Sequence, residues 1–198
     1  MGGCLRIAKA MCTSGKVNHG RYRQVELSNE NRGVYAHIDN GKIITGRGAA
    51  MATDPIEADQ VYFELKVRTS GSFAVGVGLK TPYPSKDLDR EICDNKTSYG
   101  LKSDMLAAVP EPGDIIGVYF DQRTTPRLSF SLNGLPLSDL YDVPKPGSEL
   151  KLKPGQLYPI VYVNRGAMVE VNFNEDLWEH PPDSRKGYKE LLAVQSVM

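Results

Sequence analysis

A period of two in the apolar residues, repeated in several short runs, constrains the fold of this chain more than any other feature. In residues 61–68 every second residue is apolar, from Val61 to Val67. Side chains of an extended chain point alternately to two faces, so this run predicts a strand with one dry face and one wetter face. The same alternation occurs in residues 73–79, 128–132 and 169–173. No run between them has the period of an amphipathic helix, which favours an antiparallel all-β sandwich over an α/β fold.

Turn-forming residues separate the apolar runs. The pairs Asn40-Gly41 and Asn133-Gly134 supply the positive φ angles that a two-residue type I′ hairpin turn requires, and the chain contains 19 Gly and 13 Pro. In residues 73–79 only Ala and Gly stand between the apolar side chains. A strand face this bare allows another segment to approach closely, so we expect tight packing over it.

Charge and pattern divide the chain into three parts. Residues 1–24 carry five basic side chains and no acidic one, and we interpret them as a basic, poorly ordered leader. Residues 25–180 contain the β pattern and form the predicted domain. Residues 181–198 are a C-terminal extension, in which 188–197 is the one segment expected to form a helix longer than a turn. The whole chain has 24 basic and 24 acidic residues, which argues against a general nucleic-acid binder.

Several classes of protein find no support in the sequence. No apolar run approaches the ~20 residues that a membrane-spanning helix needs. Cys4, Cys12 and Cys93 are too few and too scattered for a disulfide framework, which indicates a reducing compartment such as the cytoplasm. Neither these cysteines nor the three His residues have metal-ligand spacing, so we expect no metal site, and we expect no cofactor.

The order of several short motifs resembles that of SPRY, or B30.2-like, domains. The motifs are VYFELKV at 61–67, FAVGVGL at 73–79, SYGL at 98–101, GDIIGV at 113–118, LSFSLNG at 128–134 and LYPIV at 157–161. The resemblance covers roughly residues 25–178, and it rests on the order and spacing of the motifs more than on any single one. Outside the motifs, Gly46-Arg47-Gly48 and Pro181-Pro182 resemble a small family member that is little more than the domain.

The resemblance implies two packed antiparallel sheets and a non-catalytic module, or adaptor, that binds a protein partner, either a peptide segment or a folded protein. In the family the binding surface lies on loops at one end of the sandwich. By their order along the chain, these loops correspond to residues 46–50, 81–88 and 163–166. They offer Arg47, Tyr83, Asp87, Asn164 and Arg165. Arg and Tyr are frequent in binding hot spots because they combine contact area with directed hydrogen bonds, while Asp and Asn add polar specificity.

Other interpretations of the same residues lead to other classes of function. Residues 46–51 (GRGAAM) resemble a dinucleotide-binding fingerprint, but Asp54-Pro55 falls where the phosphate-binding helix would continue. Cys93 could act as a nucleophile with a distant His, although no catalytic motif surrounds it. Asp114 and Asp121 fit turn caps better than an acid–base pair. A structural subunit of a larger assembly is the alternative to an adaptor.

The two ends of the sequence carry signals of another kind. Gly2 is a candidate for myristoylation and Cys4 for palmitoylation, although Arg6 replaces the Ser or Thr usual at the sixth position. Anchoring by one acyl chain becomes stable with a second chain or a basic segment, which Arg6 and two nearby Lys would supply. The N-terminus therefore predicts association of a cytoplasmic protein with a membrane. Residues 196–198 (SVM) loosely resemble the carboxylate motif that PDZ domains bind.

Overall fold

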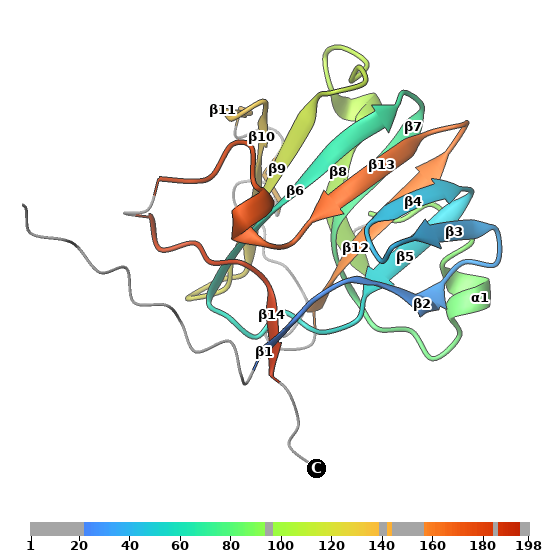
Figure 1. Ribbon diagram of the computed structural model, residues 1–198, viewed down its shortest axis with the longest axis horizontal. Coiled ribbons are helices and arrows are strands. Elements are labelled where there is room, and N and C mark those ends of the chain that lie inside the picture. Colours follow the sequence, from blue (N-terminus) through green and yellow to red (C-terminus); the bar gives the residue numbers. More distant parts are fainter. Residues whose placement is uncertain (1–21, 94–96, 139–141, 144–156, 184–185, 195–198) are drawn as a thin grey trace, which may run out of the picture.

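Two antiparallel sheets pack face to face in the computed structural model of the chain (Figure 1). The structure describes residues 22–93, 97–138, 142–143, 157–183 and 186–194. The facing sides of the sheets share one apolar core, to which both contribute Val, Leu and Phe side chains. This architecture confirms the prediction of an antiparallel all-β sandwich.

The strands form three sheets within the described residues. The seven-stranded sheet has the order β11-β10-β9-β6-β13-β4-β3, the five-stranded sheet has the order β2-β5-β12-β7-β8, and a small third sheet pairs β1 with β14. The strands are β1 (Tyr22–Gln24), β2 (Leu27–Arg32), β3 (Ala36–Asp39), β4 (Ile43–Gly46), β5 (Gly48–Ala52), β6 (Gln60–Thr69), β7 (Ser72–Leu79), β8 (Ser98–Lys102), β9 (Ile115–Asp121), β10 (Arg127–Leu132), β11 (Leu135–Pro136), β12 (Leu157–Asn164), β13 (Met168–Asn172) and β14 (Leu192–Val194). The helical elements within the described residues include α1 (Pro84–Asp87) and the single 3₁₀ turns η2 (Ser103–Met105) and η4 (Glu175–Leu177).

Both Asn-Gly pairs form the predicted hairpin turns. Asn40 and Gly41, between β3 and β4, have φ angles of 49° and 66°. Asn133 and Gly134, between β10 and β11, have φ angles of 49° and 76°. Positive φ at both central residues is the type I′ geometry, whose twist matches that of the flanking strands.

Asp114 and Asp121 cap the turns on either side of β9, as predicted. The Asp114 carboxylate accepts a hydrogen bond of 2.8 Å from the backbone N–H of Glu111, and the Asp121 carboxylate accepts one of 3.0 Å from that of Arg123. The Arg123 guanidinium also donates to Asp121, and this hydrogen bond holds the pKa of Asp121 below its usual value. Both carboxylates therefore stabilise local chain geometry.

Strand β6 is buried on both faces over residues 60–65, and the face that the sequence predicted to be wetter is so only from Lys66 onward. The apolar residues from Val61 to Val67 reach the core as expected. On the other face Tyr62 and Glu64 are also 0% exposed. The cover is the C-terminal strap, which we define as the described residues 178–183 and 186–191; it contacts Tyr62 and Glu64 through the backbone of Glu179 and His180. The predicted period is correct and the second face is wetter at Lys66 and Arg68, but its Tyr62 and Glu64 end is dry because a distant segment covers it.

The bare face of β7 is covered by the chain itself, which confirms the expected tight packing. Gly76 pairs with Gly100 of β8, and a Cβ on Gly76 would lie only 1.9 Å from the carbonyl oxygen of Tyr99. On the same side of the sheet, the segment between α1 and β8 buries three side chains against Ala74. These side chains are Leu88, Ile92 and Cys93.

The two terminal segments meet in the small third sheet, which corrects two predictions. Residues 22–24 of the expected leader form β1, and residues 192–194 of the expected helix form β14. Leu191 and Ala193 are 3% and 4% exposed and belong to the core. Their spacing of two suits a strand, whereas a helix would turn them to different sides. The remainder of the leader and of the 188–197 segment lies outside the described residues.

The close approach of β7 and β8 predicts unequal effects for two Gly→Ala substitutions. Gly76→Ala should lower the free energy of unfolding by about 3 kcal/mol, because the new methyl group would overlap backbone that cannot move aside easily. Gly166→Ala should cost about 1 kcal/mol, because its φ is +80° but nothing lies within 4 Å of the new Cβ. Urea denaturation measures both values, and a loss for Gly76→Ala no larger than that for Gly166→Ala would contradict the described packing.

Candidate functional site

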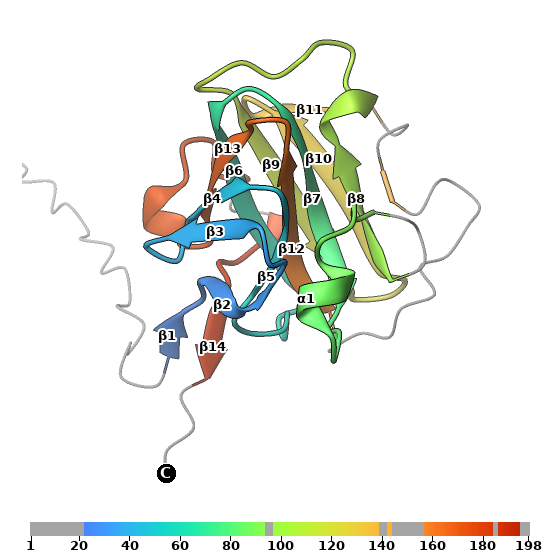
Figure 2. The same cartoon turned by 90° about the vertical axis from the view of Figure 1, so that its right-hand side faces the viewer.

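The three connections predicted to bind a partner lie along the same side of the sandwich. They are the β4–β5 connection, the β7–β8 segment that contains α1, and the β12–β13 turn. Figure 1 shows all three along its right-hand side, and Figure 2 shows that side from the front. The sequence order therefore located connections that share one side of the molecule.

Arg47 lies where the chain crosses from one sheet to the other. Gly46 ends β4 in the seven-stranded sheet, and Gly48 begins β5 in the five-stranded sheet. The backbone N–H of Arg47 donates to the carbonyl oxygen of Tyr35 (3.0 Å), and a Cβ on Gly46 would lie 2.2 Å from the same oxygen. This confirms that the glycines allow close backbone approach. The strand β5 stands where a dinucleotide-binding fold would begin its helix, which agrees with the preference for a close-packed bend over a dinucleotide fingerprint.

The turn between β2 and β3 belongs to the same surface, although the sequence did not predict it as a binding loop. Val34 and Tyr35 are 54% and 55% exposed, and the Arg47 guanidinium lies over the Tyr35 ring, 5.0 Å from its centroid. Adjacent apolar residues do not by themselves indicate exposure, since Ile115 and Ile116 of β9 are adjacent and both buried. The sequence therefore has no local signal for this exposed apolar pair.

The α1 segment is fastened to this turn and to the β4–β5 connection. The Asp89 carboxylate accepts a hydrogen bond of 2.7 Å from the backbone N–H of Val34, and the Leu88 carbonyl accepts one of 2.6 Å from that of Ala49. Leu88 is itself buried, with 4% exposure. Three loops are therefore joined by specific hydrogen bonds, and the frame that presents Arg47 and Tyr35 is fixed.

Tyr83 and Asp87 have different roles in the α1 segment. The Tyr83 side chain is 68% exposed, just before Pro84 begins the helix. Asp87 is also exposed, but its carboxylate accepts a hydrogen bond from the Thr81 hydroxyl, which in turn accepts one of 3.1 Å from the backbone N–H of Tyr83. Asp87 therefore shapes the loop that displays Tyr83.

Asn164 and Arg165 divide the work in the β12–β13 turn in a similar way. The Asn164 side chain donates to the Tyr162 hydroxyl (3.0 Å) and accepts from the backbone N–H of Arg165 (2.8 Å). Arg165 has a φ of 51°, and its side chain is exposed. Asn164 thus supports the turn, and Arg165 faces outward.

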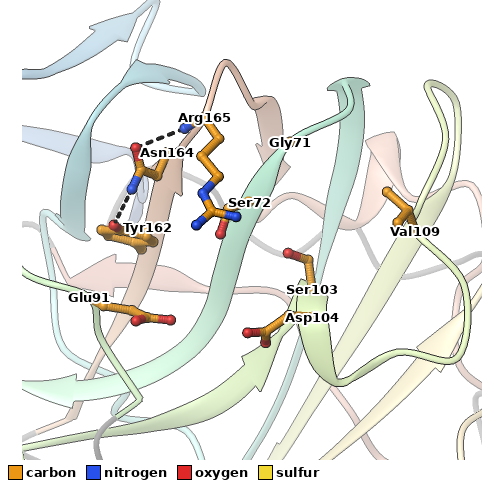
Figure 3. Close-up of a pocket in the computed structure, with 9 residues that line it drawn as sticks. All are labelled: Gly71, Ser72, Glu91, Ser103, Asp104, Val109, Tyr162, Asn164 and Arg165. Atoms are coloured by element: carbon orange, nitrogen blue, oxygen red, sulfur yellow. Dashed lines mark hydrogen bonds between the residues drawn. The ribbon is translucent and has the colours of Figure 1, made fainter.

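Arg165 borders a hollow of about 370 Å³ beside the turn (Figure 3). Ser72, Ser103 and Val109 also line it, and the last of these is 71% exposed. Figure 3 shows Arg165 entering the hollow from one side and the carboxylates of Glu91 and Asp104 entering from the other. Lys102 pairs with Glu91 at 3.1 Å. The hollow therefore presents both signs of charge to a ligand.

The predicted residues do not form a single contact cluster. Among the described residues, no hydrogen bond or ion pair joins Arg47, Tyr83 and Arg165 to one another. Gly2, Cys4 and residues 196–198 lie outside the described residues, so the lipidation and PDZ predictions have no structural counterpart. Within the described part of the chain, no three His, Cys, Asp or Glu side chains lie together as metal ligands would. In the same part, no helix is long and apolar enough to span a membrane.

Comparison with known proteins agrees with the resemblance in the sequence. The family model for the SPRY domain matches residues 60–176. The chain is similar to SPRY domain-containing protein 7 of Bos taurus and of Homo sapiens. Each is 26% identical to it over 211 residues, which cover 98% of this chain and 96% of the relative. The likeness to a small family member is thereby confirmed.

Solved structures share the fold at lower sequence identity. The SPRY domain of human HERC1 matches with a TM-score of 0.50 and 18% identity, covering 74% of this chain and 96% of that one. The TRIM65 PSpry domain matches with a TM-score of 0.55 and 14% identity, covering 76% and 91%. At sequence identities this low, the structural matches show a common fold and nothing more.

The hydrogen bond between Asp89 and Val34 predicts that one side chain holds two loops together. Asp89→Ala should lower the free energy of unfolding by about 2 kcal/mol, because it removes a charge-assisted hydrogen bond. The amide hydrogen of Val34 should exchange at least tenfold faster than in wild type. Exchange at the amides of β6 should change only as much as the lower global stability requires. Asp39→Ala, an exposed residue of β3, is the control. Unchanged exchange at Val34 would contradict a role for Asp89 in fixing the turn.

Proposed function

Because the chain belongs to the SPRY domain family, we propose that it is a cytoplasmic adaptor that binds a partner protein through the loops on one side of its sandwich. SPRY domains are generally non-catalytic modules for protein–protein interaction. We define the loop surface of this chain as Val34, Tyr35, Arg47, Tyr83 and Arg165, together with the hollow beside Arg165. This chain's adaptor role and the choice of residues are our proposal.

The observation that carries the proposal is the exposure of large side chains on a fixed frame. Tyr35 and Tyr83 are 55% and 68% exposed, and the loops that carry them lie on the same side of the molecule as the β4–β5 connection and the β12–β13 turn, which carry the two arginines (Figure 2). Exposed apolar groups that cluster beside polar ones are typical of interaction sites. Tyr and Arg gain most from burial in an interface, because each combines a large contact area with hydrogen-bond donors.

The polar groups of the surface indicate what a partner would present. Asp87 and Asn164 accept hydrogen bonds within their own loops, and Asp89 accepts one from Val34 of the β2–β3 turn. The guanidinium groups of Arg47 and Arg165 form no ion pair with another described residue, so they remain available as donors. A partner segment with carboxylate or carbonyl groups for the arginines and an apolar side chain for the tyrosines fits this arrangement. The two carboxylates in the hollow add a place for a basic side chain.

The triple variant Arg47→Ala, Tyr83→Ala, Arg165→Ala tests the loop surface. Affinity capture with a C-terminal tag, followed by mass spectrometry, should lose the specific partners, because three hot-spot truncations together weaken binding at least about 100-fold. The melting temperature should stay within about 2 °C of wild type, since all three side chains are exposed.

The matched control is the double variant Arg127→Ala, Leu135→Ala on β10 and β11, which also removes exposed side chains. Figure 1 shows these two strands on the far side of the molecule from α1. This double variant should capture the same partners as wild type. If the triple variant captured the same partners as wild type, the loop surface would be the wrong site, and a broad interface in a larger assembly would replace the adaptor interpretation.

We also propose that acylation at Gly2, with Cys4 and the basic residues that follow, associates the protein with membranes. Gly2→Ala should lower the fraction that sediments with cell membranes at least threefold, because the first acyl chain is lost. Gly3→Ala keeps the acceptor glycine and is the control. Equal sedimentation of Gly2→Ala and wild type would count against a lipid anchor.

A further inference from the structure

A carboxylate is fully buried on the outer face of the seven-stranded sheet. Glu64 of β6 is 0% exposed, and its oxygens accept hydrogen bonds from the backbone N–H groups of Glu179 (2.8 Å) and His180 (2.7 Å). Among the described residues, no Lys or Arg pairs with Glu64. Two consecutive main-chain N–H groups of the strap therefore supply most of the stabilisation that this buried charge requires.

Tyr62 completes the contact between the sheet and the strap. Its hydroxyl lies 2.9 Å from the carbonyl oxygen of His180 and 3.0 Å from the Glu64 carboxylate. Burial, with Glu64 beside it, raises the pKa of Tyr62 far above its usual value, so the hydroxyl keeps its proton and acts as a donor. The Tyr62 ring meets the Trp178 ring edge-on, with centroids 4.9 Å apart. A Cβ on Gly117 would lie 2.7 Å from the Tyr62 hydroxyl, so the missing side chain of Gly117 leaves the space that Tyr62 uses.

The strap lies on this face as an extended peptide ligand lies on its receptor. Residues 178–180 contribute one aromatic ring, two backbone N–H groups and one carbonyl group to the contact. Pro181-Pro182, which have no N–H groups, follow directly. In Figure 1 the red segment between β13 and β14 runs past the side of the molecule where β9 and β10 lie. Recognition of this kind depends on a ring and main-chain groups, which another polypeptide can also provide.

We propose that the outer face formed by Tyr62, Glu64 and Gly117 is a second protein-binding surface, which residues 178–180 occupy in cis as an autoinhibitory contact. The partner that fits is an extended segment with an aromatic residue followed by two residues that have free N–H groups. The chain's own Trp178-Glu179-His180 is the pattern for such a segment. This surface is separate from the loop surface and does not depend on it.

The strap can leave this face without leaving a charge buried and unpaired. Once residues 178–180 move away, water reaches Glu64 and replaces the lost donors. Glu179 is exposed, and Trp178 and His180 are half-buried, so opening uncovers mainly Tyr62 and Glu64 and leaves the apolar core between the sheets closed. The core anchors Leu191 and Ala193 lie farther along the chain, next to and within β14. Opening of a segment with few buried apolar contacts requires less free energy than global unfolding.

Trp178→Ala tests whether the face accepts a segment in trans, because it weakens the strap and leaves Tyr62 and Glu64 in place. The probe is a fluorescent peptide with the sequence of residues 174–183, NEDLWEHPPD. By fluorescence anisotropy it should bind the full-chain variant at least tenfold more tightly than wild type, in which the strap competes at a high effective concentration. A peptide with Ala in place of Trp should bind at least tenfold more weakly. Amides of Glu179 and His180 should exchange faster in the variant, while amides of β9 remain protected.

A second substitution, Glu64→Gln in the Trp178→Ala background, separates a binding face from a merely structural contact. The strap of the double variant is held even less firmly, yet the peptide should bind at least tenfold more weakly because the carboxylate is gone. Glu170→Gln in the same background is the matched control, since Glu170 lies on the same sheet and pairs with Arg68. If Glu64→Gln does not fold, Tyr62→Phe removes a hydrogen bond from the same face and should weaken the peptide too.

Three outcomes would overturn the proposal. The first is absence of peptide binding to Trp178→Ala, and the second is equal binding to Trp178→Ala and wild type. The third is an affinity that Glu64→Gln changes no more than Glu170→Gln does. None of these outcomes bears on partner capture by the loop surface, so failure of this proposal is distinguishable from failure of the proposed adaptor function.

Discussion

Coverage of both faces of β6 is the constraint on which much of this structure depends. On one side its apolar residues, such as Phe63, meet the five-stranded sheet and form the core. On the other side Tyr62 and Glu64 are polar, so their burial requires hydrogen-bond partners as well as packing. The strap supplies those partners from a segment more than a hundred residues away in sequence, as the separation of Glu64 from Glu179 shows. The C-terminal segment is therefore part of the sheet's structure, and its path is set by the needs of two side chains on β6.

Close backbone packing also holds the loop surface firmly where it meets the sheets. Gly46 and Gly48 allow the chain to pass from one sheet to the other while touching the backbone of Tyr35 and Leu88. The Asp89 carboxylate then joins α1 to the β2–β3 turn. Side chains on such a frame lose little conformational freedom on binding, so the entropic cost of binding is smaller. The same hydrogen bonds that fix the fold therefore hold the loops of Arg47 and Tyr35 in place, as the proposed binding of a partner requires.

Local patterns in the sequence predicted the parts of the fold that depend on nearby residues. Period-two runs marked β6, β7, β10 and β13, and Asn-Gly pairs marked two hairpin turns, because strand faces and turn φ angles follow from adjacent residue types. The burial of Glu64 and the strand β14 could not be predicted in this way. Each depends on a partner far away in sequence, and although the spacing of Leu191 and Ala193 suits a strand, no local feature indicates which segment pairs with it or what covers Glu64.

The candidate site shows the same division. Family order placed Arg47, Tyr83 and Arg165 in loops on one side, and the structure finds all three exposed there. Asp87 and Asn164 were chosen as specificity residues, yet each makes hydrogen bonds within its own loop. Val34 and Tyr35 were missed because the run was interpreted as strand, and only the path of the turn reveals their exposure. The sequence thus predicted the positions of the loops, whereas the direction of each side chain could be determined only from the structure.

The loop surface and the strap-covered face use the sandwich in two different ways. Loop residues such as Tyr83 face solvent at no cost to the core, so their identity is free to follow a partner. Tyr62 and Glu64 lie within the sheet, and their identity also has to satisfy the strap. Figure 1 places the strap and α1 on different sides of the molecule, so one ligand does not block the other by contact. Coupling between the two surfaces would require the core between them to have a second arrangement. The dense apolar packing of Phe63, Val75 and Val161 between the two sheets opposes this, so we expect the two proposed surfaces to act independently.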